Sequence, residues 1–225
     1  MSILRDFIKE AIELDNSIIT PESQIFCDMD GVLVNFEAAV VDLVNTILDT
    51  GEVPGVASTK GHRKRLGWLR RELGPDWRAA SRPDLDLKPV RNMMFSAIGQ
   101  NPGAVFAGMP PWPDALSELW PYITSTGNTV NILSAPIRAR EGAPSTAAEG
   151  KTAWVEEWLS PQPSDIIITP AVQKVQFAVS GEVPNILIDD KKSTIDSWNA
   201  AGGIGILHFP GGSAATVKKL REIGL

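Results

Sequence analysis

The chain has 225 residues and a formal net charge of −6, and 43% of its residues are hydrophobic. This composition is typical of a globular protein with one domain, or with one domain that carries a sizeable insert, and it excludes a disordered or fibrous chain. No apolar run approaches the ~18 residues of a membrane-spanning helix, no apolar segment of a secretory signal is present, and one cysteine excludes an internal disulfide framework. We therefore expect a cytoplasmic protein with no membrane partner.

The first part of the chain predicts a helix, a strand and a second helix. Apolar residues recur at helical spacing over 2–14, and we assign 1–20 to an N-terminal helical segment that packs on the protein or on a second copy in a homodimer. Residues 25–27 form a short apolar run that stops at a polar turn, as a strand buried in a parallel sheet does. Residues 36–50 predict a helix that ends at Gly51.

The long segment that follows shows no strand-like alternation. Residues 52–110 contain many prolines, two tryptophans and a basic run at 60–71, and we interpret 36–112 as an inserted helical cap. The basic run is read first as a solvated helical face. The alternative reading is a contact surface for a nucleotide phosphate or a nucleic-acid backbone.

Strands and helices alternate after Pro113. Strands are predicted at 130–133, 165–169, 185–188 and 204–209, and helices at 114–121, 150–159, 171–179, 191–201 and 213–223. Together with the strand at 25–27, this pattern predicts an α/β fold, a Rossmann-like parallel sheet with helices on both faces. The core of this fold comprises 21–35 and 113–225, with the cap of 36–112 inserted into it.

Polar side chains stand where three of these strands end. Asp28 and Asp30 follow the first strand, Ser134 follows the second, and Asp189 and Asp190 follow the fourth. The carboxyl ends of parallel strands meet at one edge of a sheet, where ligands bind. Four carboxylates at one edge could not all ionise without a positive partner, and oxygen ligands favour Mg²⁺. Such a set suits phosphoryl transfer, for which an aspartate can be the covalent nucleophile.

Two further side-chain types would complete a phosphate site. The hydroxyl of Ser134 could donate a hydrogen bond to a phosphate oxygen, and the ammonium of Lys151, near the start of a predicted helix, could bind the same oxygens. Lys174 is the alternative lysine.

These residues resemble the motifs of the haloacid dehalogenase-like (HAD) superfamily. Residues 28–32, Asp-Met-Asp-Gly-Val, resemble its first motif; Ser134 resembles the second, Lys151 the third, and Asp189-Asp190 the fourth. The order and the strand context match across residues 25–209. Segments 133–137, 151–156 and 187–190 resemble, more narrowly, the 5′(3′)-deoxyribonucleotidase branch and related phage-encoded proteins.

The resemblance implies a Mg²⁺-dependent phosphomonoester hydrolase that acts through an aspartyl-phosphate, with a (deoxy)nucleoside 5′-monophosphate as substrate. Asp28 would be the nucleophile, and Asp30 would protonate the leaving oxygen and then activate water. Asp28, Asp30 through its backbone carbonyl, Asp189 and Asp190 would form the metal site. Ser134 and Lys151 would hold the phosphate, with Lys174 as the alternative lysine, and a cap between the first two motifs would favour small substrates.

The chain departs from this branch at two places. Residues 169–174 read Thr-Pro-Ala-Val-Gln-Lys where the branch is expected to show Thr-Arg-Asp-Lys, and Ala135 replaces a hydroxyl residue. Lys151 is preferred to Lys174 as the third-motif lysine because its Trp-Val-Glu context matches. The alternatives left open are a phosphatase for nucleic-acid end phosphates or for another small phosphomonoester, and a non-catalytic HAD-fold binding module.

Overall fold

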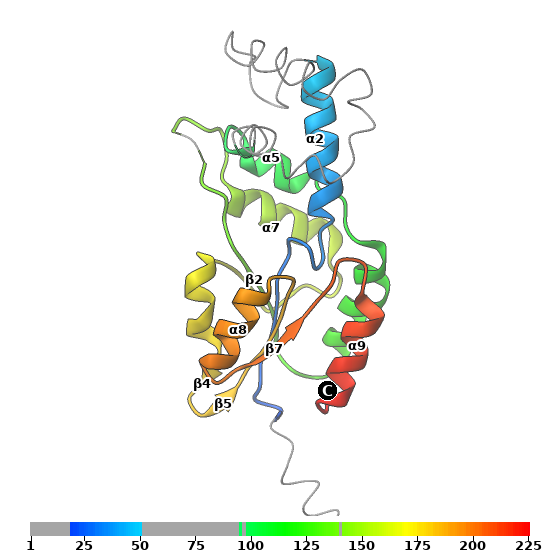
Figure 1. Ribbon diagram of the computed structural model, residues 1–225, viewed down its shortest axis with the longest axis vertical. Coiled ribbons are helices and arrows are strands. Elements are labelled where there is room, and N and C mark those ends of the chain that lie inside the picture. The colour runs from blue at the N-terminus through cyan, green and yellow to red at the C-terminus, as the bar shows by residue number, and fades with distance from the viewer. Residues whose placement is uncertain (1–18, 51–94, 96–97, 140) are drawn as a thin grey trace, which may run out of the picture. The chain divides into compact units, whose positions relative to one another are not determined.

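The described residues of the protein form two units. The computed structural model describes residues 19–50, 95, 98–139 and 141–225 (Figure 1). The first unit comprises Met1–Val32, Pro113–Ser134 and Pro163–Leu225, and the second comprises Leu33–Trp112 and Ala135–Gln162. The helix predicted at 2–14 and the basic run at 60–71 lie outside the described residues, so both stay predictions.

The first unit is built on a five-stranded parallel sheet. The strand order is β3 (Asp165–Ile168), β2 (Val130–Ser134), β1 (Ile25–Cys27), β6 (Ile186–Asp189) and β7 (Ile204–Leu207). Each neighbouring pair is parallel. The three central strands are buried at every residue and are mostly apolar, because both of their faces are covered. The predicted α/β Rossmann-like fold class is confirmed.

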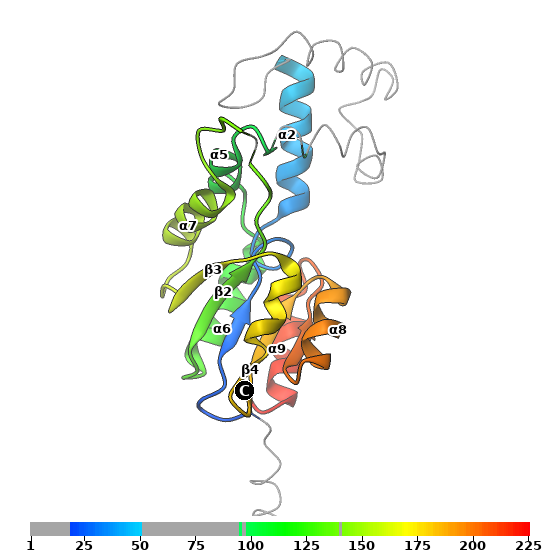
Figure 2. The same ribbon diagram turned by 90° about the vertical axis from the view of Figure 1, so that its left-hand side faces the viewer.

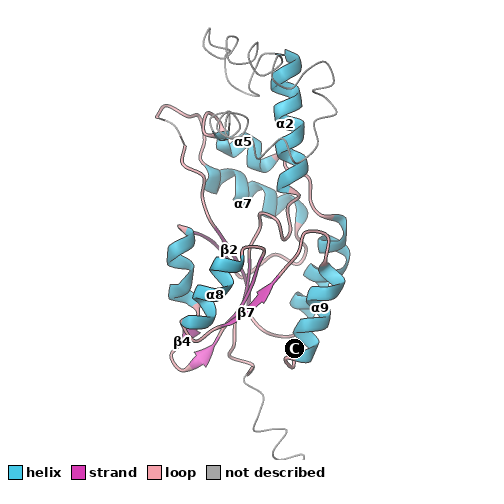
Figure 3. Ribbon diagram, in the orientation of Figure 1, coloured by secondary structure: helices cyan, strands magenta, loops and turns pink. Residues whose placement is uncertain are grey.

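Helices cover the two faces of this sheet. One face carries the 3-10 helix η4 (Ala171–Phe177) and α8 (Lys192–Ala200). The other carries the π-helix η3 (Ala115–Leu119), α6 (Trp120–Ser125) and α9 (Ser213–Glu222). Figure 1 shows α8 and α9 on opposite sides of the sheet, and Figure 3 shows the strands between the helices.

A buried aromatic contact fixes η4 on its face of the sheet. The ring of Phe26 on β1 lies 5.7 Å from the ring of Phe177 at the end of η4 and 5.7 Å from that of Trp198 on α8. Burial of three aromatic side chains in one place contributes several kcal/mol, on the order of 2 kcal/mol for each. The short helix η4 is thereby held rigidly beside the central strand.

The helices of the first unit differ from their predictions at the ends. The helix predicted at 114–121 is a π-helix followed by α6, and it reaches Ser125. The helix predicted at 171–179 ends at Phe177 and is followed by a small antiparallel hairpin, β4 (Val179–Ser180) with β5 (Val183–Pro184), which was not predicted. Strands of two residues are too short to show a periodicity in the sequence.

The second unit contains three helices among its described residues. These are α2 (Phe36–Thr50), α5 (Pro102–Ala107) and α7 (Ala147–Trp158). Helices α5 and α7 touch backbone to backbone, since a Cβ atom on Gly150 would overlap the carbonyl oxygen of Gly103. Figure 2 shows α5 and α7 next to each other. Residues 135–162, which the sequence predicts as part of the core 113–225, fall in the same unit as the predicted cap 36–112.

The chain enters and leaves its long insert through paired segments. Val34 forms an antiparallel bridge with Pro111, the N–H of Asn35 donates to Pro110 O at 2.9 Å, and the N–H of Trp112 donates to Leu33 O at 2.8 Å. In the described part of the chain, no helix is both long and apolar enough to cross a membrane.

Candidate active site

The two central strands bring Asp28 and Asp189 side by side. The backbone N–H of Asp28 donates to the carbonyl oxygen of Ile188 at 2.9 Å, so the residues that follow β1 and β6 continue in register. From β1 the chain fills one half of the sheet with β2 and β3 and then the other half with β6 and β7. The carboxyl ends of the neighbouring strands β1 and β6 therefore mark the topological switch point, where the ligands of such sheets bind.

Three aspartates form a cluster at this point, and we call Asp28, Asp189 and Asp190 the aspartate cluster. One carboxylate oxygen from each lies within 4.8 Å of those of the other two. Asp28 and Asp189 are buried, and Asp190 is exposed. The structure thus brings three of the four predicted metal ligands together, and Asp30 follows Asp28 by two positions in the same loop.

Lys174 lies between the two buried aspartates. Its Nζ atom is 2.7 Å from Oδ2 of Asp189 and 3.1 Å from Oδ2 of Asp28, and the side chain is 2% exposed. Burial alone would lower the pKa of Lys174, but the charges of Asp28 and Asp189 outweigh it and raise the pKa above its ordinary value. The ammonium is therefore charged at neutral pH and holds both carboxylates in place.

Backbone N–H groups hold the other oxygens of the same two carboxylates. Oδ1 of Asp28 accepts from the N–H of Met29 at 2.8 Å, and Oδ1 of Asp189 accepts from the N–H of Lys191 at 2.8 Å. Both carboxylates are thus oriented at each of their oxygens. Hydrogen bonds of this charge-assisted kind are stronger than those between neutral groups.

The negative charge of the site exceeds the positive charge of Lys174. Burial and the charge of Asp28 raise the pKa of Asp189. Partial burial and then the charges of Asp28, Asp189 and Asp30 raise the pKa of Asp190 to about 7. The three carboxyl groups of the aspartate cluster outnumber the one ammonium, and the atoms that they offer to a metal are all oxygens. This donor set fits a hard divalent cation.

Ser134 and Lys151, the two predicted phosphate ligands, belong to different units. Ser134 is buried at the carboxyl end of β2, the strand next to β1, and its carbonyl oxygen accepts from the N–H of Thr169 at 3.0 Å. Lys151 lies on α7 in the second unit, fully buried, with its Nζ atom 4.6 Å from the centre of the Phe106 ring. The register of the sheet places Ser134 at the same edge as Asp28.

The contacts favour Lys174, the alternative lysine predicted from the sequence, as the lysine of the site. Sequence context supported Lys151, whereas the structure shows the aspartates paired with Lys174. A topological signal for Lys174 was present: it lies a few residues after β3, and an element that directly follows a parallel strand starts at the carboxyl edge of the sheet. Which lysine binds the phosphate stays a prediction, and these contacts support Lys174.

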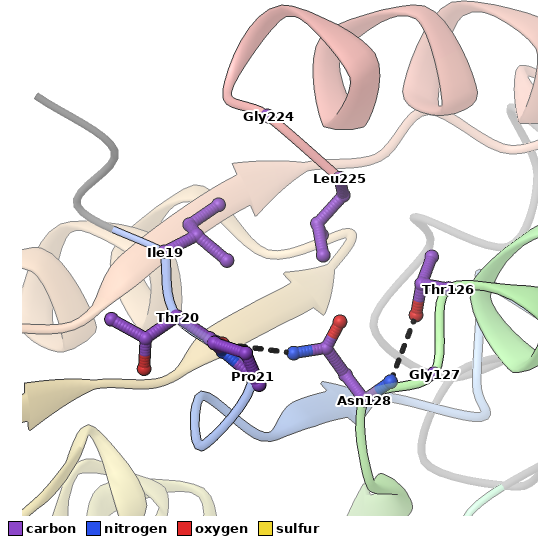
Figure 4. A pocket seen from close by; sticks show the side chains of 8 residues that line it. All are labelled: Ile19, Thr20, Pro21, Thr126, Gly127, Asn128, Gly224 and Leu225. Carbon is purple, nitrogen blue, oxygen red and sulfur yellow. Dashed lines mark hydrogen bonds between the residues drawn. The ribbon is translucent and has the colours of Figure 1, made fainter. Parts of the chain in front are cut away.

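A pocket of about 320 Å³ lies elsewhere in the first unit. It is lined by residues that precede β1, residues that precede β2, and the last residues of the chain: Ile19, Thr20, Pro21, Thr126, Gly127, Asn128, Gly224 and Leu225 (Figure 4). These segments lie at the amino ends of the strands, at the edge opposite the aspartates. The pocket contains none of the predicted site residues.

Comparison with known proteins gives similar structures at low sequence identity. No protein-family model and no curated protein sequence matches this chain. A haloacid dehalogenase-like family hydrolase from Streptococcus pneumoniae is similar with 15% identity and a TM-score of 0.47, over 89% of this chain and 91% of that one. A protein from Thermotoga maritima described as a β-phosphoglucomutase is similar with 15% identity and a TM-score of 0.43, over 89% and 99%.

A phosphonoacetaldehyde hydrolase-like protein from Oleispira antarctica is also similar, with 13% identity and a TM-score of 0.43, over 92% of this chain and 79% of that one. At these values the similarity says nothing about the activity of this chain, which has to be inferred from its own side chains.

Proposed function

We propose that this protein is a Mg²⁺-dependent phosphomonoester hydrolase of the HAD type that acts through an aspartyl-phosphate on Asp28. The observation that carries this proposal is the ion-paired arrangement of Asp28, Lys174 and Asp189 at the switch point of a parallel sheet, with Asp190 beside them. A nucleophile needs a fixed position and a charged partner, and Asp28 has both.

The reaction begins on the Asp28 carboxylate. One of its oxygens attacks the phosphorus, the bond from phosphorus to the ester oxygen breaks, and Asp30 gives its proton to that oxygen, so the alcohol leaves. The product on the protein is a mixed anhydride of Asp28 and phosphate. Lys174 keeps the carboxylate oriented for this attack and offsets part of the negative charge.

Water completes the cycle. Asp30, now ionised, takes a proton from a water molecule whose oxygen attacks the phosphorus, and the bond from phosphorus to Asp28 breaks. Inorganic phosphate leaves, the Asp28 carboxylate is restored, and Asp30 is again protonated. The hydroxyl of Ser134 donates to a phosphate oxygen in both steps.

A magnesium ion would be held by the aspartate cluster and by the backbone carbonyl of Asp30. When bound, the ion neutralises the negative charge of the phosphate, which lets the anion approach a carboxylate nucleophile. Loss of a halide, the chemistry of a dehalogenase, requires neither a proton donor nor a cation. The aspartate cluster together with Asp30 therefore favours a phosphate ester as substrate.

For the substrate we propose a (deoxy)nucleoside 5′-monophosphate. The proposal is supported by the resemblance of residues 133–137, 151–156 and 187–190 to deoxyribonucleotidases. The residues that would select the leaving group belong to the insert, most of which lies outside the described residues.

Phosphate release from a panel of phosphomonoesters tests this function. The panel contains ribo- and deoxynucleoside 5′- and 3′-monophosphates, sugar phosphates and a 5′-phosphorylated oligonucleotide, each with Mg²⁺ and with EDTA. We expect release concentrated in the nucleoside 5′-monophosphates and at least ~100-fold slower in EDTA, because the phosphate charge is then not neutralised. Release that is equal with Mg²⁺ and EDTA would contradict the metal dependence, and release from another member alone would replace the substrate.

A further inference from the structure

Asp190 differs from the other members of the aspartate cluster in how it is held. Asp28 and Asp189 are bound by Lys174 and by backbone N–H groups. For Asp190 the described residues provide no hydrogen bond and no ion pair, and its side chain is exposed. An exposed carboxylate without a partner samples several rotamers, so contacts of another kind must decide where it lies.

That contact is made by Gly31, in the turn that follows Asp30. A Cβ atom built on Gly31 would overlap Oδ2 of Asp190, and it would lie 2.7 Å from Cγ and 3.2 Å from Cβ of the same side chain. The Asp190 carboxylate therefore occupies the space that any residue other than glycine would fill. Two loops that are far apart in the sequence can lie this close together because Gly31 has no side chain.

The backbone of Gly31 gives a second reason for glycine, and the two reasons can be separated. Its φ angle is +81°, in a region that residues with a Cβ atom rarely adopt. Gly127 has a φ of +87°, but a Cβ atom on Gly127 would meet no atom within 4 Å. The same substitution at Gly127 thus carries the backbone strain without any overlap, which makes it a matched control.

We propose that Gly31 is a positioning residue for the metal site, because its missing side chain lets the Asp190 carboxylate join Asp28 and Asp189. This inference rests on the proposed function, since it assigns Asp190 as a ligand of the magnesium ion. Gly31 itself touches neither the metal nor the phosphate in this account. Its effect passes through the position of Asp190.

The experiment is a double-mutant cycle with two readouts. The variants are Gly31→Ala, Asp190→Ala, the two combined, and Gly127→Ala. Unfolding by urea in EDTA measures how the contact between residues 31 and 190 affects stability when no metal is bound. Calorimetric titration with Mg²⁺ measures the affinity of the site for the metal when no substrate is present. Asp190→Ala leaves only the Cβ atom of residue 190 near the new methyl group, at 3.2 Å, a contact that a small shift relieves.

In EDTA we expect Gly31→Ala to lower the urea midpoint more than Gly127→Ala does. When Asp190→Ala is added to Gly31→Ala, the drop in the urea midpoint should shrink to that of Gly127→Ala, because the carboxylate that the new methyl group overlaps is gone. In the Mg²⁺ titration we expect Gly31→Ala and Asp190→Ala each to weaken Mg²⁺ binding by ~10-fold or more. The combined variant should bind Mg²⁺ no more weakly than Asp190→Ala alone. Gly127→Ala should bind Mg²⁺ as the wild type does.

Three outcomes overturn parts of this account separately. If Gly31→Ala binds Mg²⁺ as the wild type does, Gly31 does not position a ligand, and the proposed function stands. If the effects of the two substitutions simply add in both readouts, the contact does not couple them, and the inference fails. If the wild type itself binds no Mg²⁺, the proposed metal-dependent function fails, and this inference fails with it, whatever the unfolding cycle in EDTA shows.

Discussion

Replacing Asp28 with asparagine is expected to reduce phosphate release by at least ~10³-fold while the chain stays folded. The amide has the size and shape of the carboxylate, but it has no anionic oxygen to attack phosphorus. Lys174 keeps its 2.7 Å contact with Asp189 in this variant, so the site retains an ion pair. The measurements are kcat/KM on the best substrate of the panel and the midpoint of thermal unfolding.

Asp196→Asn is the control for this substitution. Asp196 is an exposed aspartate on α8 that pairs with Lys192 at 2.7 Å on the surface, and it should retain full activity. An Asp28→Asn variant with near-wild-type activity would exclude Asp28 as the nucleophile. A variant that is inactive and also unfolded would point to a structural role instead.

Of the substitutions considered, replacing Lys174 with methionine is expected to cause the largest loss of stability, measured at neutral pH. Asp28 and Asp189 would then lie buried without the ammonium that now contacts both, and breaking a buried ion pair from one side costs ~3–5 kcal/mol. Activity should be lost as well, because the nucleophile is no longer oriented. Urea unfolding at several pH values measures the effect.

The pH dependence of this loss has a definite sign. Burial and the charge of Asp28 already raise the pKa of Asp189, and loss of Lys174 removes the group that opposes that rise. As the pH falls, the unpaired carboxyl of Asp189 takes up a proton and the cost of burying its charge disappears. The difference in stability between wild type and Lys174→Met should therefore be largest near neutral pH and should narrow toward acid pH.

Lys151→Met makes the same change at a second lysine that is buried among the described residues, in the second unit. We expect Lys151→Met to leave the ion pairs of the aspartates intact. The difference in stability between wild type and Lys151→Met should therefore not narrow toward acid pH. The opposite assignment, with a pH-dependent loss in Lys151→Met and none in Lys174→Met, would return the role of the site lysine to Lys151.

The sheet could be predicted from the sequence because its strands are short apolar runs that end in polar residues. Ile25–Cys27 and Ile186–Asp189 are buried on both faces, and such strands leave a direct trace in the sequence. The sequence also contains a signal for the start of α7 that the prediction did not use. Thr146 and Glu149 form a capping box, so the helix begins before Gly150, where we had placed its start.

Local sequence context did not indicate that Lys174 pairs with the aspartates. Lys174 reaches the aspartates because η4 is held on the sheet by the contact between Phe26 and Phe177, and these two rings are distant in the sequence. The contact of Gly31 with Asp190 also joins distant loops, and a glycine in a turn reveals only that a turn is present. Both features depend on how the strands pair, which no local pattern records.

Trapping the covalent intermediate tests the central claim most directly. The enzyme would be mixed with the best substrate of the panel and Mg²⁺, quenched within a turnover and reduced with borohydride, which converts an aspartyl-phosphate to homoserine. Mass spectrometry of the peptides then locates the change. The account predicts homoserine at position 28, with none in the absence of substrate. Turnover with no modified residue, or with the modification at another aspartate, would contradict it.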